Sequence, residues 1–155
     1  MKKLRIYLDT SVLGGCFDPE FSEWSNRLMD DFRLGRVVPV LSDVTADEVT
    51  SAPPAVRALH VELLAIADDI VPITNEALSL VASYEDHGVL GKRFRNDMLH
   101  IALATISEVD VLVSWNFRHI VRLDHIRVFN AVNIELGYKM LAIFSPREVM
   151  SHEQE

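Results

Sequence analysis

The chain has 155 residues, of which 49% are hydrophobic and 25% charged, and its net charge is −8. This length suits one domain with its own core, and the balance of residue types excludes a disordered chain. No apolar run approaches the roughly 20 residues that a membrane-spanning helix needs, and Arg5 and Asp9 interrupt the start too early for a signal peptide. Cys16 is the only cysteine, so we expect a reducing compartment, the cytoplasm, and no membrane association.

Short apolar segments typical of strands alternate with segments of helical periodicity along the whole chain. Strands are predicted over residues 4–8, 37–41, 70–73, 111–114 and 141–144. Helices are predicted over residues 20–34, from 45 to before Pro53, and over 55–67, 75–84, 96–107 and 126–136. Pro39 suggests that the second strand ends there or lies at an edge of the sheet.

This alternation predicts an α/β fold with a single domain of three layers, α/β/α, around a mostly parallel central sheet. Continuous apolar strands agree, because strands covered on both faces lose the alternating pattern. We assign residues 1–150 to this domain and residues 151–155 to a short polar tail.

Three acidic residues occupy positions that such a fold brings to one edge of the sheet. Asp9 ends the first strand, Glu48 lies in the first turn of the helix after the second strand, and Asp97 opens a helix that is otherwise apolar. Each has a structural alternative: Asp9 an Asx turn, Asp97 a helix cap or a first-turn residue favoured by the helix macrodipole, and Glu48 the last residue of a capping box that begins at Thr45.

Carboxylates that crowd together raise one another's pKa, and a divalent cation removes that cost. Oxygen ligands of this kind suit Mg²⁺ or Mn²⁺, with water molecules completing the coordination shell. Such an ion can activate a water molecule and neutralise charge on a phosphodiester. The spacing of the three acids is therefore compatible with metal-assisted hydrolysis.

Four segments carry a resemblance to a known family. Residues 6–13, 41–49 and 96–104 look like the three acidic motifs of PIN domains, in the order and spacing of that family, and residues 111–120 resemble its fourth motif. The resemblance covers nearly the whole chain and points to PIN-domain ribonucleases of the VapC toxin type.

The resemblance implies that Asp9, Glu48 and Asp97 are the ligands of Mg²⁺ or Mn²⁺. Asn116 takes the fourth catalytic position, where the family often has aspartate. Because asparagine is neutral, it cannot offset the charge of a second cation, which favours a one-metal site or a weak second site. Thr10 and Ser11 are candidates to support the site through a metal-bound water or phosphate, with helix capping as the alternative.

Basic residues concentrate in one part of this acidic chain. Between residues 37 and 91 there is a single basic residue, Arg57, whereas residues 92–127 contain six. Lys92, Arg118 and Arg122 are therefore our candidates for RNA contact, and the alternative is a solvated helical face. His119 shares this interpretation.

Several other polar residues have simpler explanations. His100 lies three residues after Asp97, on the same helical face, and we expect a buried histidine or a donor to a metal ligand. Asp43 and Asp47 are spare acids near Glu48, with Asp47 the better substitute for it. We expect the thiol of Cys16 to be structural.

The resemblance implies an endoribonuclease, the toxin of a toxin–antitoxin pair, with an RNA substrate, a small cognate antitoxin and a homodimeric assembly. The alternative is a catalytically weak PIN-like module that binds RNA or a protein partner. A P-loop enzyme is excluded, because Gly91-Lys92 is followed by arginine in place of serine or threonine.

Overall fold

The apolar segments pair into one sheet in the computed structural model, which describes residues 2–152. Its five strands run in the order β3-β2-β1-β4-β5, and every neighbouring pair is parallel. Their bounds are Arg5–Leu8 for β1, Val38–Ser42 for β2, Asp69–Val71 for β3, Val111–Val113 for β4 and Ile143–Phe144 for β5. The first strand of the chain is thus the central strand of the sheet.

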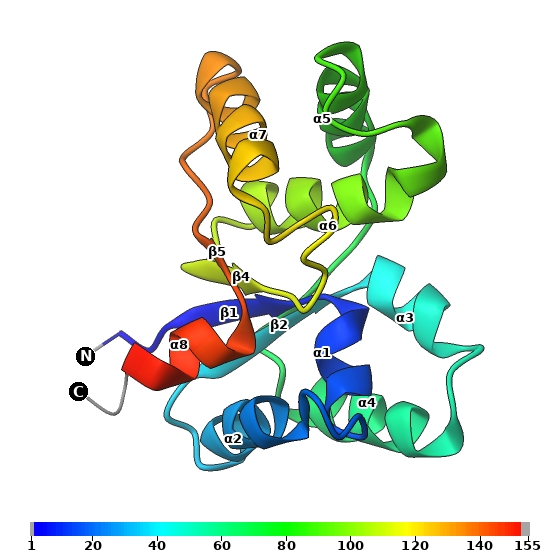
Figure 1. Ribbon diagram of the computed structural model, residues 1–155, viewed down its shortest axis with the longest axis vertical. Helices are drawn as coiled ribbons and strands as arrows, with labels where there is room; N and C mark the ends of the chain where they lie inside the picture. The colour runs from blue at the N-terminus through cyan, green and yellow to red at the C-terminus, as the bar shows by residue number, and fades with distance from the viewer. Residues whose placement is uncertain (1, 153–155) are drawn as a thin grey trace.

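Helices cover both faces of this sheet (Figure 1). Their bounds are Thr10–Gly15 for α1, Ser22–Arg33 for α2, Asp43–Val49 for α3, Pro54–Ile66 for α4, Asn75–Asp86 for α5, Arg95–Ile106 for α6, Leu123–Glu135 for α7 and Pro146–His152 for α8, with a 3-10 turn over Lys92–Phe94. Helices α5, α6 and α7 lie on one side of the sheet, and α1, α2 and α4 lie on the other. The prediction of one three-layer α/β/α domain with a parallel sheet is confirmed.

The two layers of helices enclose two separate cores, because successive side chains of a strand point to opposite faces. Tyr7 packs with residues of α5, α6 and α7, while Ile6 and Leu8 pack with residues of α1, α2 and α4. These three side chains of β1 are fully buried. This burial on both faces explains why the strand lacks an alternating pattern.

The prediction that Pro39 marks an edge strand is wrong, because β2 lies between β1 and β3. Pro39 is the second residue of β2, and the pairing with β3 begins only at Val40, opposite Asp69. The carbonyl oxygen of Pro39 still accepts a hydrogen bond from the backbone of Asp68. Proline is tolerated here because its missing N–H precedes the first pair of this ladder.

Two short helices were absent from the prediction. Helix α1 has six residues, too few for the helical spacing of apolar residues to be recognised in the sequence. Helix α8 begins with a capping box, in which Ser145 Oγ accepts from the backbone of Glu148 and Glu148 Oε1 accepts from the backbone of Ser145. It includes residues 151 and 152 of the segment that we assigned as a tail, and residues 153–155 lie outside the described part of the chain.

Two helix starts also differ from the prediction. Helix α7 begins at Leu123, three residues early, and α3 begins at Asp43, where Ser42 is the cap and accepts from the backbone of Thr45 at 3.4 Å.

Across residues 2–152, no helix combines the length and the apolar character that crossing a membrane requires.

The two glycines of α1 should respond oppositely to alanine. A Cβ at Gly15 would lie 2.6 Å from Trp115 Nε1 and 2.7 Å from Ser25 Oγ, whereas a Cβ at Gly14 would meet nothing within 4 Å. We expect Gly15→Ala to lower the free energy of unfolding by about 1–3 kcal/mol through overpacking. Gly14→Ala should leave it unchanged or raise it by up to about 1 kcal/mol, because alanine favours the helix. Urea unfolding of both variants tests this, and equal effects would contradict the packing shown here.

Candidate acidic site

Asp9 follows the central strand and is buried, with 4% of its surface exposed. Its Oδ1 accepts a hydrogen bond from Ser11 Oγ and its Oδ2 accepts one from Ser114 Oγ, each at 2.6 Å. Asp9 is the N-cap residue of α1, but its side chain caps no backbone N–H. The carboxylate is therefore held by two hydroxyl groups from different elements, and the Asx-turn alternative is wrong.

Burial is the main reason why the pKa of Asp9 is raised above its ordinary value. The charge of Glu48 raises it further, while His100 and the two serine hydroxyls oppose the shift. A buried carboxylate with a raised pKa is costly to ionise. A positive charge bound beside Asp9 would therefore stabilise its ionised form.

Glu48 lies in the last turn of α3, not in its first turn as predicted. Its Oε1 accepts hydrogen bonds from His100 Nε2 at 2.7 Å and from Thr10 Oγ1 at 2.8 Å. Burial acts to raise the pKa of Glu48, but the hydrogen bonds from His100 and Thr10 and the charge of His100 outweigh it, so the pKa is lowered. The capping-box alternative for Glu48 is wrong, because Ser42 caps this helix.

His100 is buried on α6, with 2% of its surface exposed, as one of the sequence interpretations expected. Its Nε2 faces Glu48 and its Nδ1 lies 2.7 Å from the hydroxyl of Tyr7, which donates to Ser42 Oγ at 2.7 Å. Because a carboxylate only accepts, Nε2 carries the hydrogen that points to Glu48. A series of hydrogen-bonded side chains thus runs from Ser42 at the end of β2, through Tyr7 on β1 and His100 on α6, to Glu48.

Asp97 lies in the first turn of α6, as predicted, with its side chain 22% exposed. Its Oδ2 accepts a hydrogen bond from His119 Nδ1 at 2.9 Å, and the ring of His119 packs on Phe94 at 3.9 Å between centroids. Phe94 is the N-cap residue of α6 and no side chain caps this helix end, so the cap alternative for Asp97 is wrong, whereas its first-turn position agrees with the macrodipole alternative. Asp97, like Glu48, is thus bonded by a histidine.

Asn116 uses its side-chain oxygen within the turn after β4. Its Oδ1 accepts from the backbone of His119 at 2.9 Å, and its own backbone N–H donates to Ser114 Oγ. The amide therefore positions the segment that carries both His119 and Ser114. Asn116 thus links His119, which bonds Asp97, to Ser114, which bonds Asp9.

The structure brings Asp9 and Glu48 near one another and turns Asp97 toward His119. The three carboxylates fit Mg²⁺ or Mn²⁺ by their chemistry, because they are oxygen donors and, within residues 2–152, none pairs with lysine or arginine. In that same range, no three histidine, cysteine, aspartate or glutamate side chains gather closely enough to hold a metal ion. Binding an ion through all three acids thus requires the carboxylates to lie closer together than they do here.

Within residues 2–152, the predicted basic residues make no ion pair with the three carboxylates. Lys92, Arg118 and Arg122 are exposed, and Arg122 pairs with Asp124 at 2.8 Å. Asp43 and Asp47 are also exposed. Thr10 and Ser11 contact the acids directly, which neither of their sequence interpretations stated.

Ser114, which bonds Asp9, and Tyr7, which bonds His100, were not found from the sequence. Ser114 had a usable signal, because it follows β4 and so lies beside Asp9 at the carboxyl edge of the sheet. Tyr7 had none, since its position within an apolar strand is typical of a core residue. Cys16 is buried, as expected for a structural thiol, and burial raises its pKa to about 11.

Asp9 and Glu48 should have opposite effects on the pH dependence of stability. The folded pKa of Asp9 is raised above 3.8, so ionisation of Asp9 costs the folded state stability as the pH rises through this window. Asp9→Asn should therefore gain stability over wild type as the pH increases. The folded pKa of Glu48 is lowered below 4.5, so Glu48→Gln should lose stability at neutral pH, and the loss should vanish as the pH falls through the folded pKa.

Urea unfolding in EDTA between about pH 3 and pH 8 measures both differences. The two variants serve as controls for each other, because each removes one charge. Parallel pH profiles for the two variants would contradict the environments described above.

The comparisons with known proteins give information on the fold alone. No protein-family model matches the chain, and no curated protein matches it in sequence. One similar solved structure is VapBC2 from Rickettsia felis bound to a DNA fragment from their promoter, with 13% identity, a TM-score of 0.56, and coverage of 92% of this chain and 98% of that chain. Another is FitAcB from Neisseria gonorrhoeae, with 18% identity, a TM-score of 0.58, and coverage of 91% and 97%. The chain therefore shares its whole fold with these proteins, which agrees with the VapC-type resemblance of its motifs.

Proposed function

We propose that this protein is a metal-dependent endoribonuclease whose acidic site binds Mg²⁺ or Mn²⁺ through Asp9, Glu48 and Asp97. The observation that carries the proposal is the burial of Asp9 beside Glu48 with no lysine or arginine paired to either, within residues 2–152. A carboxylate in this position gains most from a divalent cation. Hydrolysis of an RNA phosphodiester is the reaction that such a site supports best.

The protein's own contribution is to hold each acid in one orientation. Ser11 and Ser114 fix Asp9, Thr10 and His100 fix Glu48, and His119 fixes Asp97. The bound ion supplies charge neutralisation at the phosphate and an activated water. Residues that orient metal ligands in this way typically contribute about 10- to 100-fold to metal affinity or activity.

One metal ion suits this site better than two. The side-chain oxygen of Asn116 already accepts a hydrogen bond from the backbone of His119, and an amide carries no charge to balance a second cation. Mg²⁺ is commonly bound by one or two carboxylates together with water molecules. Asn116 therefore acts in this proposal by shaping the turn around Ser114.

We further propose that the protein is the toxin of a toxin–antitoxin pair in the cytoplasm. The similar structures are VapBC2 and FitAcB, which supports a small cognate antitoxin as a partner of this chain. A homodimer is the assembly that we propose for it. The exposed basic residues Lys92 and Arg118 are available for phosphate contacts despite the net charge of −8, and Arg122 would join them by leaving Asp124.

The second candidate is a catalytically weak module that binds RNA or a protein partner. It is favoured by one observation, that the described residues 2–152 contain no ready cluster of three metal-binding side chains. Metal binding and RNA cleavage distinguish the two candidates.

Asp97→Asn is the variant that tests the metal site. We expect Mn²⁺ to raise the Tm of the wild type, because an ion that binds only the folded state stabilises it, and to leave Asp97→Asn nearly unchanged. RNA cleavage by the variant should fall by more than the roughly 100-fold that marks the loss of an orienting residue. The measurements are thermal unfolding with and without Mn²⁺ and cleavage of total RNA.

Asp47→Asn is the matched control, because Asp47 is an exposed acid on the helix that carries Glu48. It should respond to Mn²⁺ and cleave RNA as the wild type does. If Mn²⁺ fails to shift the wild type and no RNA is cleaved, the non-catalytic candidate takes precedence.

A further inference from the structure

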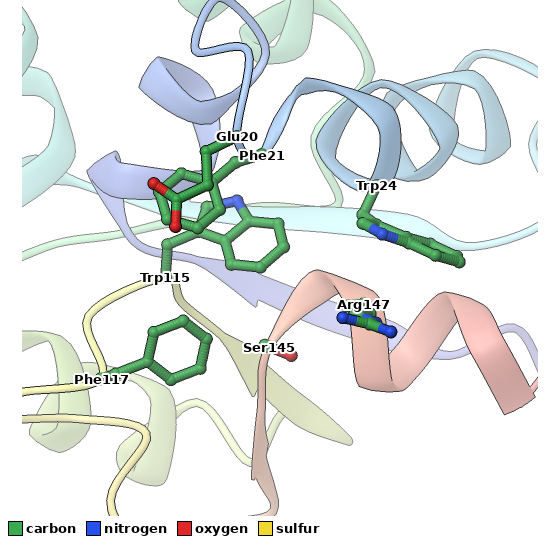
Figure 2. Close-up of a pocket in the computed structure, with 7 residues that line it drawn as sticks. All are labelled: Glu20, Phe21, Trp24, Trp115, Phe117, Ser145 and Arg147. Carbon is green, nitrogen blue, oxygen red and sulfur yellow. The ribbon is translucent and has the colours of Figure 1, made fainter.

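An aromatic pocket of about 230 Å³ lies near the acidic site (Figure 2). Its walls include four aromatic residues, Phe21, Trp24, Trp115 and Phe117, and two charged residues, Glu20 and Arg147. Figure 2 shows Phe21 and Trp115 together on one side and Trp24 with Arg147 on the other. Nothing in the proposed hydrolysis requires these residues, so the pocket needs a separate explanation.

The aromatic walls are held rigidly. Phe21 stacks on Trp115 with the ring centroids 4.3 Å apart and the planes 24° from parallel. Trp115 Nε1 donates to the buried Ser25 Oγ at 2.8 Å, which fixes the indole in its plane. Phe117 meets Trp115 edge-on at 6.1 Å, and half of its own surface is exposed. A large aromatic side chain is thus presented to solvent from a rigid base.

Charged groups of both signs border the aromatic walls. The guanidinium of Arg147 lies 5.9 Å from the centre of the Trp24 ring, and that of Arg27 lies 4.7 Å from it. Within residues 2–152, neither Arg147 nor Glu20 makes an ion pair. These two side chains are available to bind groups outside the protein, a donor and an acceptor at the rim of one aromatic surface.

The pocket is joined to the acidic site by one side chain. Ser11 Oγ donates to Asp9 at 2.6 Å and accepts from the backbone N–H of Trp115 at 2.9 Å. The residue before Trp115 is Ser114, the second hydroxyl donor to Asp9. Trp115, which lines the pocket, is therefore connected to Asp9 through Ser11.

We propose that the aromatic pocket binds one unpaired base of the RNA, which rests on the ribonuclease function proposed above. Single-stranded RNA is recognised by stacking splayed bases on aromatic side chains and arginine planes. Arginine and glutamate can also donate to and accept from the edges of bases. The pocket is smaller than the roughly 300–1,000 Å³ of sites for drug-sized ligands, which suits a single ring system.

A base is favoured over an apolar side chain of a protein partner by the charged rim. Burying an unpaired arginine and an unpaired glutamate against an apolar group would leave both unsatisfied. A nucleotide brings hydrogen-bonding edges and a phosphate to those groups. The occupant of the pocket is thus a nucleobase.

The test is a comparison of Phe117→Ala with Phe17→Ala. Both phenylalanines are about equally exposed, at 50% and 54%, but only Phe117 lines the pocket. Binding is measured by fluorescence anisotropy at low salt in EDTA, which prevents metal-dependent cleavage. The probes are a random single-stranded RNA of about 12 nucleotides and an abasic oligomer of the same length and charge.

Wild type and Phe17→Ala should prefer the RNA over the abasic oligomer by about 5- to 100-fold, the range expected for stacking one base. Phe117→Ala should lose most of this preference while it binds the abasic oligomer as the wild type does. If Phe117→Ala keeps the preference, the pocket takes no base, and a side chain of a protein partner becomes its occupant.

Cleavage in Mn²⁺, measured separately on the wild type and Asp97→Asn, distinguishes the two proposals. If the wild type cleaves RNA and Phe117→Ala keeps the base preference, only the role of the pocket is overturned. If the wild type neither cleaves nor binds RNA, both proposals are overturned.

Discussion

The burial of one carboxylate at the end of the central strand is the constraint on which the site depends. Asp9 follows β1, which has a strand on each side and helices on both faces, so little water reaches its oxygens. Burying an ionised group requires hydrogen-bond donors, and they come from Ser11 on α1 and from Ser114 after β4. Neighbouring elements must therefore end at fixed positions around this residue.

Each of the other two acids has a histidine partner, with a different consequence for each. His100 is buried and supported by Tyr7, so its contact with Glu48 belongs to the core and lowers the pKa of that acid. His119 lies on a turn and packs on Phe94, so its contact with Asp97 is more accessible. The acidic site thus contains one acid, Glu48, held by a buried histidine, and another, Asp97, held by a histidine on a more exposed turn.

The segment after β4 connects these features. Within a few residues it supplies Ser114 to Asp9, Trp115 and Phe117 to the aromatic pocket, Asn116 to the turn, and His119 to Asp97. Because parallel strands end at the same edge of a sheet, this segment lies beside the end of β1 although it is about 100 residues away in the chain. Because β4 pairs with β1, one segment therefore supplies residues to both the acidic site and the aromatic pocket.

The sequence by itself determined the fold class, since alternating apolar strands and periodic helices allow few arrangements other than a covered parallel sheet. It also located the edge where Asp9 lies and the first-turn position of Asp97. The tertiary structure alone decided that Glu48 ends its helix, that β2 is internal despite Pro39, and that Tyr7, Ser114 and His119 orient polar groups of the site. The physical reason is that hydrogen bonds between segments far apart in the chain depend on packing, which local patterns do not encode.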